Sequence, residues 1–124
     1  MSFLIMSAYS ELMRFELYLA REDFHGLYQT VRKQLLDQKP RSSPTMEEIC
    51  AAVDVACAWY WKHVLCLQRS AATTCLMKRH GVPAQMVVGV QQMPFRSHAW
   101  VEVAGRVIND KPYIPDLYSI LDRC

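Results

Sequence analysis

The chain has 124 residues, of which 52% are hydrophobic and 21% are charged, and its 14 basic and 12 acidic residues give a net charge of +2. This length suits one domain with a single core, and the apolar content excludes a disordered chain and leaves some apolar surface for a partner. The charges form no basic block and no nucleic-acid-binding motif is present, so we do not expect DNA or RNA as a ligand.

The N-terminus and the cysteines indicate where the protein resides. Residues 1–9 are apolar, but they carry no basic segment and are far shorter than the ~20 residues that cross a bilayer. We expect neither a signal peptide nor a membrane span. The five cysteines are odd in number and most lie among helix formers, which disfavours a secreted disulfide framework. We therefore expect a reduced, cytoplasmic protein.

Two short helices are predicted between residues 10 and 37, with a break near His25 and Gly26. Apolar residues at helical spacing form one stripe on each helix: Leu12, Phe15 and Leu19 on the first, and Leu27, Val31 and Leu35 on the second. Residues 38–44 are polar, contain two prolines and show no periodicity. They are predicted to form a loop that bounds this helical segment.

A third helix is predicted to begin after Thr45, because Thr45 and Glu48 have the spacing of a capping box. It should end near the aromatic cluster at 59–61. Its apolar residues recur at helical intervals and define the buried face: Ile49, Val53, Ala56 and Tyr60.

A fourth helix should begin near Cys66 and end at His80. Gly81 can adopt the left-handed conformation that ends a helix, and Pro83 cannot continue one. This helix is therefore predicted with a defined beginning and a defined end.

Strands follow the helices. Residues 85–90 are rich in β-branched side chains, and residues 98–103 and 106–110 flank Ala-Gly in a hairpin pattern. Helices followed by strands indicate an α+β fold with a small antiparallel sheet. We expect residues 1–45 to be an N-terminal helical segment of the same domain, and residues 46–124 to form its core.

Cys66 differs from the other cysteines because it lies at the predicted N-terminus of a helix. Unpaired amides and the helix dipole there favour a thiolate, and the same amides could hold an oxyanion. Cys75 lies about half a rotation round the same helix, so it cannot face the same site. Cys50 and Cys57 are interpreted as core residues, and Cys124 as a frayed terminal residue.

The predicted strands offer a base and a group to orient it. His98 is predicted to begin a strand directly after a loop at 91–97, a usual place for catalytic side chains. A two-residue turn at Ala104 and Gly105 would place His98 and Asp110 on opposite faces, whereas a three-residue turn at 103–105 would pair them.

We expect the three-residue turn, because it also creates two favourable cross-strand pairs, Glu102 with Arg106 and Trp100 with Ile108. Cys66 would then attack a carbonyl carbon, His98 would accept and return the proton, and Asp110 would orient the imidazole. Asn109 is an alternative orienting residue, but this turn directs it to the other face. The reaction class is acyl transfer to water.

Three segments carry these residues: CLQRS at 66–70, RHGVPAQMVVGV at 79–90 and HAWVEVAGRVIND at 98–110. Together they resemble the lasso-peptide leader peptidases, members of the transglutaminase-like cysteine protease superfamily. The resemblance covers roughly residues 59–110, with 32 residues from the cysteine to the histidine and 12 more to the aspartate. It implies a papain-like arrangement and, as substrate, the leader of a ribosomally made peptide.

The resemblance also implies partners. In that family a separate ATP-using, asparagine-synthetase-like cyclase closes the ring after the leader is removed. Many members carry a winged-helix leader-recognition domain fused in front. The residues before the three segments are predicted to be helical, so we expect the recognition domain to be a separate protein and the working unit to be a complex.

Several single residues have a second interpretation. His63, Cys57, Cys75 and His80 could be a metal set, but their spacings match no usual zinc pattern, and we expect no metal or cofactor. Trp100 shares the predicted face of His98 and is a candidate for substrate binding, although a packing role is the commoner fate of a tryptophan.

Two other functions remain open from the residues. The same triad could serve an amidase or a transglutaminase-type acyltransferase with an amine as acceptor. A chain without catalysis could instead be an adaptor that delivers the precursor to the cyclase.

Overall fold

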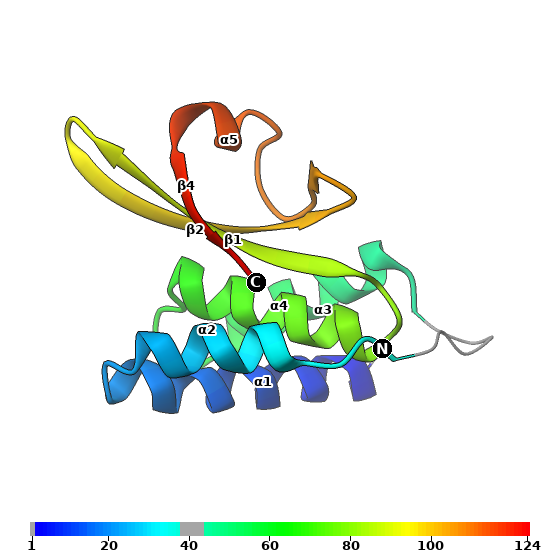
Figure 1. Cartoon of the computed structure of the whole chain (residues 1–124). Helices are drawn as coiled ribbons and strands as arrows, with labels where there is room; N and C mark the ends of the chain where they lie inside the picture. The colour runs from blue at the N-terminus through cyan, green and yellow to red at the C-terminus, as the bar shows by residue number, and fades with distance from the viewer. Residues whose placement is uncertain (1, 38–43) are drawn as a thin grey trace.

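The computed structural model describes residues 2–37 and 44–124, and a small sheet covers one side of its helical layer (Figure 1). In chain order the elements are α1 (Ser2–Ala20), α2 (Phe24–Lys33), α3 (Met46–Trp59), α4 (Cys66–Arg79), β1 (Ala84–Gln92), β2 (Phe95–Val103), β3 (Arg106–Val107), α5 (Ile114–Leu117) and β4 (Ser119–Arg123). Four helices precede the first strand in the described chain, so the predicted α+β class is confirmed.

The break between the first two helices lies earlier than predicted. The carboxylate of Asp23 accepts a hydrogen bond from the N–H of Gly26 over 2.9 Å and caps α2, so His25 and Gly26 lie inside the first turn of α2. Leu35 follows the end of α2 and is exposed, so its predicted place on the buried stripe is wrong. The predicted loop at 38–44 falls almost entirely outside the described residues.

The other helix boundaries agree with the sequence patterns. Thr45 and Glu48 form both hydrogen bonds of the capping box, at 3.1 and 3.2 Å, and α3 ends at Trp59. α4 begins at Cys66 and ends before Gly81, whose φ of 81° lies in the left-handed region. No helix within residues 2–37 and 44–124 is long and apolar enough to cross a membrane.

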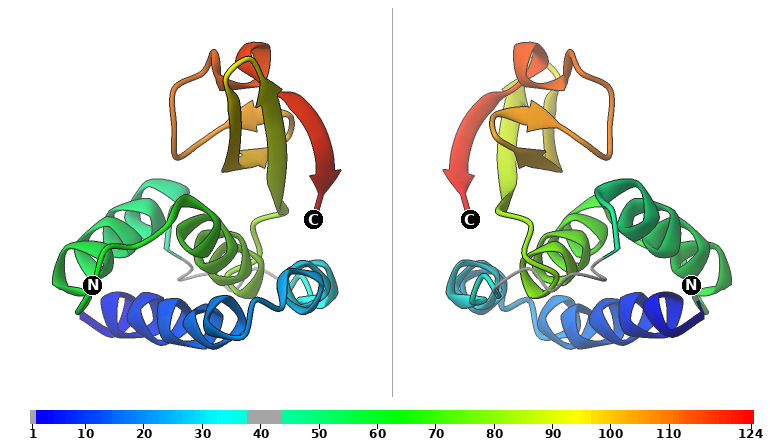
Figure 2. Two further views of the ribbon diagram at one scale, coloured as in Figure 1. Left: turned by 90° about the vertical axis from the view of Figure 1, so that its left-hand side faces the viewer. Right: turned by 90° about the vertical axis from the view of Figure 1, so that its right-hand side faces the viewer.

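α4 lies between α1 and the sheet, as the side views show (Figure 2). It therefore buries residues on both sides, and the apolar ones are Ala71, Ala72, Cys75, Leu76 and Met77. One hydrophobic cluster joins these residues to α1, α2, α3, β1 and β2. The division of the chain at residue 45 stays a prediction.

The sheet has the strand order β3-β2-β1-β4, with antiparallel pairs throughout. β1 pairs with β2 from Ala84 opposite Val103 to Gln92 opposite Phe95. The predicted loop at 91–97 is therefore wrong, because most of it is strand. His98 lies in the interior of β2, not at its beginning.

The C-terminal strand was not predicted. β4 pairs with β1, and the N–H of Cys124 donates to the carbonyl of Met86 over 2.7 Å. Cys124 is buried. The interpretation of Cys124 as frayed is wrong, because pairing with β1 holds the end of the chain against the sheet.

The hairpin between β2 and β3 has the two-residue turn. Val103 lies opposite Arg106, and both turn residues have positive φ, 52° at Ala104 and 76° at Gly105. A turn of this kind matches the right-handed twist of the strands it joins. The predicted three-residue turn is therefore wrong.

The side-chain pairs predicted from that turn are absent as well. Glu102 lies opposite Val107, and its carboxylate forms an ion pair of 2.6 Å with Arg123 of β4. Trp100 and Ile108 belong to different clusters, since Ile108 packs on the main core and Trp100 does not.

The two faces of the sheet have different neighbours. Val88 and Ala99 belong to the main core and face the helices. Val87, Trp100 and Ile114 form a second cluster on the other face, where α5 lies (Figure 1). Because neighbouring residues of a strand alternate between faces, His98 lies on the same face as Trp100.

Candidate active site

Cys66 is the first residue of α4, as the sequence predicted, and it is exposed. Leu65 precedes it at the cap position and offers no side-chain acceptor to the helix. The backbone N–H groups of the first turn are thus without a capping side chain, and they favour negative charge at this point. They can stabilise a thiolate or the oxyanion of a tetrahedral intermediate.

Gln68 fixes the beginning of α4, a role that the sequence analysis missed. This buried side chain donates hydrogen bonds to the carbonyl of Leu12 over 2.8 Å and to the carboxylate of Glu16 over 3.2 Å. Glu16 also accepts from the hydroxyl of Tyr60 and from Lys62. The sequence shows a glutamine two residues after Cys66, which could have indicated this role. Its partners lie more than 50 residues away in sequence, so no local pattern predicts them.

His98 and Asp110 are in direct contact. Nε2 of His98 and Oδ2 of Asp110 are 2.6 Å apart, and about a quarter of each side chain is exposed. With a two-residue turn, the expectation from the sequence is that this pairing fails. That expectation is wrong, because β3 ends at Val107 and the chain then leaves the ladder.

The departure from the ladder depends on Asn109. The N–H of Ile108 still donates to the carbonyl of Val101, but the N–H of Val101 donates to Oδ1 of Asn109, over 3.0 Å in both cases. A side-chain oxygen thus replaces a backbone carbonyl. Asp110 is released from the alternation that would have turned it away from His98.

The carboxylate of Asp110 is held in its charged form. Partial burial raises its pKa, but hydrogen bonds with His98 and from the N–H of Lys111 outweigh burial, and the pKa lies below its ordinary value. Because Asp110 occupies Nε2 of His98, Nδ1 is the ring nitrogen left for proton transfer.

Two aromatic side chains support the imidazole. The ring of His98 stacks with Trp100 and Tyr118, at centroid distances of 6.0 and 5.6 Å. Trp100 is fully buried and its indole N–H donates to Glu102 over 2.9 Å. Trp100 therefore packs under His98, and its contact with substrate stays a prediction.

Gly89 makes this stack possible. A Cβ at Gly89 would lie 2.8 Å from Cβ of Tyr118 and 2.9 Å from the ring of Trp100. Both distances are too short for carbon atoms, so only glycine fits beside the stack.

Cys66 and His98 border one cavity of about 320 Å³. They reach it from different sides of β2, since α4 lies under one face of the sheet and His98 stacks on the other. Among the hydrogen bonds of the described residues, none joins Cys66 to His98. Catalytic groups often come within hydrogen-bond reach, about 2.6–3.2 Å, only when substrate is bound.

The other cysteines lack the features of a nucleophile. Burial raises the pKa of Cys75 to about 12, and it also raises the pKa of Cys50, Cys57 and Cys124. Within residues 2–37 and 44–124, no group of three or more His, Cys, Asp or Glu side chains could hold a metal ion.

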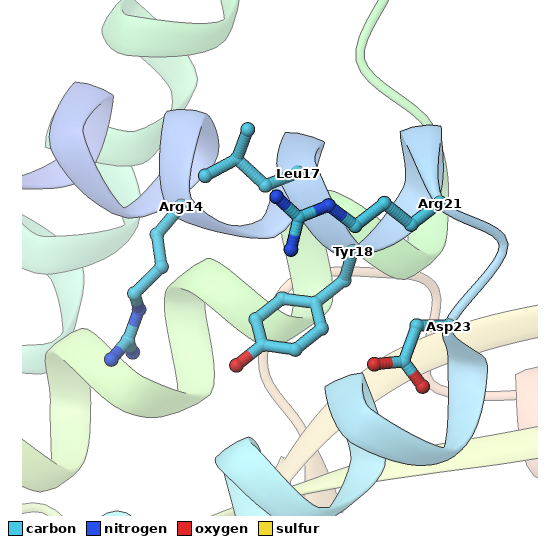
Figure 3. Close-up of a pocket in the computed structure, with 5 residues that line it drawn as sticks. All are labelled: Arg14, Leu17, Tyr18, Arg21 and Asp23. Atoms are coloured by element: carbon cyan, nitrogen blue, oxygen red, sulfur yellow. The ribbon is translucent and has the colours of Figure 1, made fainter.

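A second hollow of about 200 Å³ lies at the junction of α1 and α2 (Figure 3). Its lining residues are Arg14, Leu17, Tyr18, Arg21 and Asp23. It contains no cysteine or histidine, and its one carboxylate already caps α2. The hollow therefore offers no nucleophile and no base for acyl transfer.

Comparison with known proteins assigns the fold to a family. Residues 10–121 match the transglutaminase-like superfamily. The chain belongs to the transglutaminase-like superfamily. The match begins within α1 and ends in β4, so it includes Cys66, His98 and Asp110.

A curated relative is the microcin J25-processing protein McjB of Escherichia coli, with 43% identity over 56 residues. The aligned part covers 45% of this chain and 27% of that protein, so the chain matches about a quarter of its relative. No solved structure gives a significant match.

Proposed function

We propose that this protein is a cysteine peptidase that removes the leader from a lasso-peptide precursor. The observation that carries the proposal is the 2.6 Å contact between His98 and Asp110 beside a cavity that Cys66 also borders. Membership of the superfamily supports acyl-transfer chemistry, and the similarity to a microcin-processing protein supports a peptide precursor as substrate.

In the proposed reaction Sγ of Cys66 attacks the carbonyl carbon of the scissile peptide bond, and the thiol proton passes to Nδ1 of His98. Backbone N–H groups of the first turn of α4 stabilise the oxyanion. The C–N bond then breaks, and His98 returns the proton to the departing amine. Asp110 holds the imidazole in one tautomer and stabilises its protonated form.

Water completes the cycle. His98 takes a proton from the water molecule whose oxygen attacks the thioester carbon. The bond to Sγ breaks, the leader leaves with a free carboxylate, and Cys66 recovers its proton.

We propose two partners for this activity, a separate winged-helix protein that binds the leader and an asparagine-synthetase-like cyclase that acts after cleavage. Apolar side chains on the outer face of α1 offer a contact surface for such a protein: Phe3, Met6, Met13 and Leu17 are all exposed.

The test is cleavage of a lasso-peptide precursor, followed by mass spectrometry, with the leader-binding protein added. We expect the wild-type chain to release the leader, and Cys66→Ala and His98→Asn to release none. Cys57→Ala and His80→Asn are matched controls, because neither residue borders the cavity. Full cleavage by Cys66→Ala would contradict the proposal.

A transglutaminase-type acyltransferase is the second candidate, because superfamily membership is compatible with either acceptor. Cleavage in the presence of a primary amine distinguishes the two. Hydrolysis leaves a free carboxylate on the leader, whereas acyl transfer leaves an amide that carries the amine. An adaptor without catalysis would give neither product.

A further inference from the structure

The cavity beside Cys66 has walls of apolar side chains from five elements. They are Phe24 and Tyr28 of α2, Leu67 of α4, Val88 and Val90 of β1, Phe95 and Ala99 of β2, and Leu121 of β4. Phe95 and Leu121 are 73% and 65% exposed. The wall therefore presents large apolar side chains to solvent next to the nucleophile.

Leu121 owes its position to an irregularity of β4. Ile120 lies opposite Gly89, and Asp122 lies opposite Val88, so Leu121 is an extra residue without a partner on β1. Such bulges redirect a side chain and are common beside active sites. The bulge places Leu121 at the cavity.

The residues that line the cavity favour an apolar occupant. None of the described residues that line the cavity is Asp, Glu, Lys or Arg. A charged side chain would lose its hydration there without an Asp, Glu, Lys or Arg side chain to pair with, whereas an apolar side chain gains about 25 cal/mol for each Å² removed from water.

The position of the cavity indicates that its occupant is part of the substrate. Cys66 and His98 both line the cavity, so a group in it lies next to the residues proposed to react. The volume of about 320 Å³ is at the lower end of ligand pockets, about 300–1,000 Å³. It suits one side chain of a peptide.

We propose that this cavity is a specificity subsite that holds one apolar side chain of the substrate, next to the bond that Cys66 cleaves. The inference rests on the proposed function, and it names the substrate class as peptides with a bulky apolar residue beside the cleavage site. Leu121 is a specificity-determining residue of this subsite.

The first test measures the selectivity of the cavity through the alkylation rate of Cys66, without peptide cleavage. Cys66 is alkylated with iodoacetamides whose nitrogen carries an isobutyl, a carbamoylmethyl or a carboxymethyl group. Sγ bonds to the methylene carbon, iodide leaves and the thiol proton goes to solvent. We expect the isobutyl reagent to modify Cys66 ~10-fold faster than the two polar reagents, relative to their rates with free cysteine.

Leu121→Ala should reduce this advantage about threefold, in line with the smaller apolar contact. Leu35→Ala is the matched control, because Leu35 is 76% exposed, follows the end of α2 and does not line the cavity. Thermal unfolding of both variants checks that the fold is intact. Equal relative rates for the three reagents in the wild-type chain would overturn the proposal.

The second test varies the substrate. Precursors with Leu, Asn or Asp at each position within three residues of the cleavage site differ in polarity while keeping nearly the same shape. We expect one position at which Leu gives ~10-fold higher kcat/KM than Asn or Asp. Cleavage that depends on Cys66 but shows no such position would sink the subsite and leave the proposed function standing. Selective alkylation without any cleavage would overturn the proposed function, and with it the role of the cavity as a substrate subsite.

Discussion

Asn109 accepts a hydrogen bond from the backbone N–H of Val101 over 3.0 Å, and this contact decides where Asp110 lies. In a regular ladder the acceptor would be the carbonyl of Ile108. The side chain of Asn109 takes that place, so the next residue leaves the strand and reaches His98. The orientation of the candidate base therefore depends on a residue that does not touch it.

Replacing Asn109 with alanine should lower both the stability of the protein and the activity of the site. The N–H of buried Val101 would lose its acceptor, which costs about 1–3 kcal/mol, and Asp110 would lose its fixed position. Urea unfolding measures the first effect, and kcat/KM for precursor cleavage measures the second. Asn109→Asp keeps the oxygen acceptor and should retain most of the activity. Wild-type stability and activity in Asn109→Ala would contradict this role.

The charge of Asp110 should make part of the stability depend on pH. The pKa of Asp110 is lowered in the folded chain, so its contribution is present above the ordinary aspartate value of about 3.9 and is lost as the pH falls through the lower folded value. The free energy of unfolding of the wild-type chain should thus fall more steeply below about pH 4 than that of Asp110→Asn. Urea unfolding between pH 6 and pH 3 gives both curves.

Glu16 and Glu102 also have lowered pKa values, and they contribute to both curves. Only the difference between the wild-type chain and Asp110→Asn reports on Asp110. Parallel curves over the whole range would show that Asp110 gains nothing from its contacts on folding.

Alkylation should separate the cysteines by exposure and pKa. Cys66 is exposed, whereas Cys75 is buried with a pKa of about 12, so at pH 8 only about one Cys75 thiol in ten thousand would be ionised. We expect iodoacetamide to modify Cys66 first, as followed by peptide mapping. The fast phase should disappear in Cys66→Ala. Early modification of Cys75 in the folded protein would contradict the structure.

Substituting Gly89 with alanine should disturb the stack under His98. The new Cβ would meet Tyr118 and the ring of Trp100 at less than 3 Å, and overpacking of this kind costs about 1–3 kcal/mol. Thermal unfolding and cleavage rate are the measurements. Gly105→Asn is the control, because nothing lies within 4 Å of a Cβ there and asparagine tolerates a positive φ. Equal effects of the two substitutions would argue against a steric role of Gly89.

Local patterns in the sequence determined the boundaries of α3 and α4 and the candidate residues. The capping box at Thr45, the beginning of α4 at Cys66 and its end at Gly81 each depend on contacts within a few residues, so the sequence predicts them. The three segments that carry Cys66, His98 and Asp110 resemble members of the transglutaminase-like superfamily, whose model matches residues 10–121.

Only the tertiary structure decided the register and the surroundings of the site. Two competing turns fit Ala104-Gly105, and the choice depended on strand twist and on Asn109, which no local pattern encodes. β4 escaped prediction because its exposed residues give no alternation, and it is held by pairing with β1. The bulge at Leu121 also arises from the pairing of β4 with β1. The apolar wall beside Cys66 therefore forms only when segments that are distant in the sequence come together.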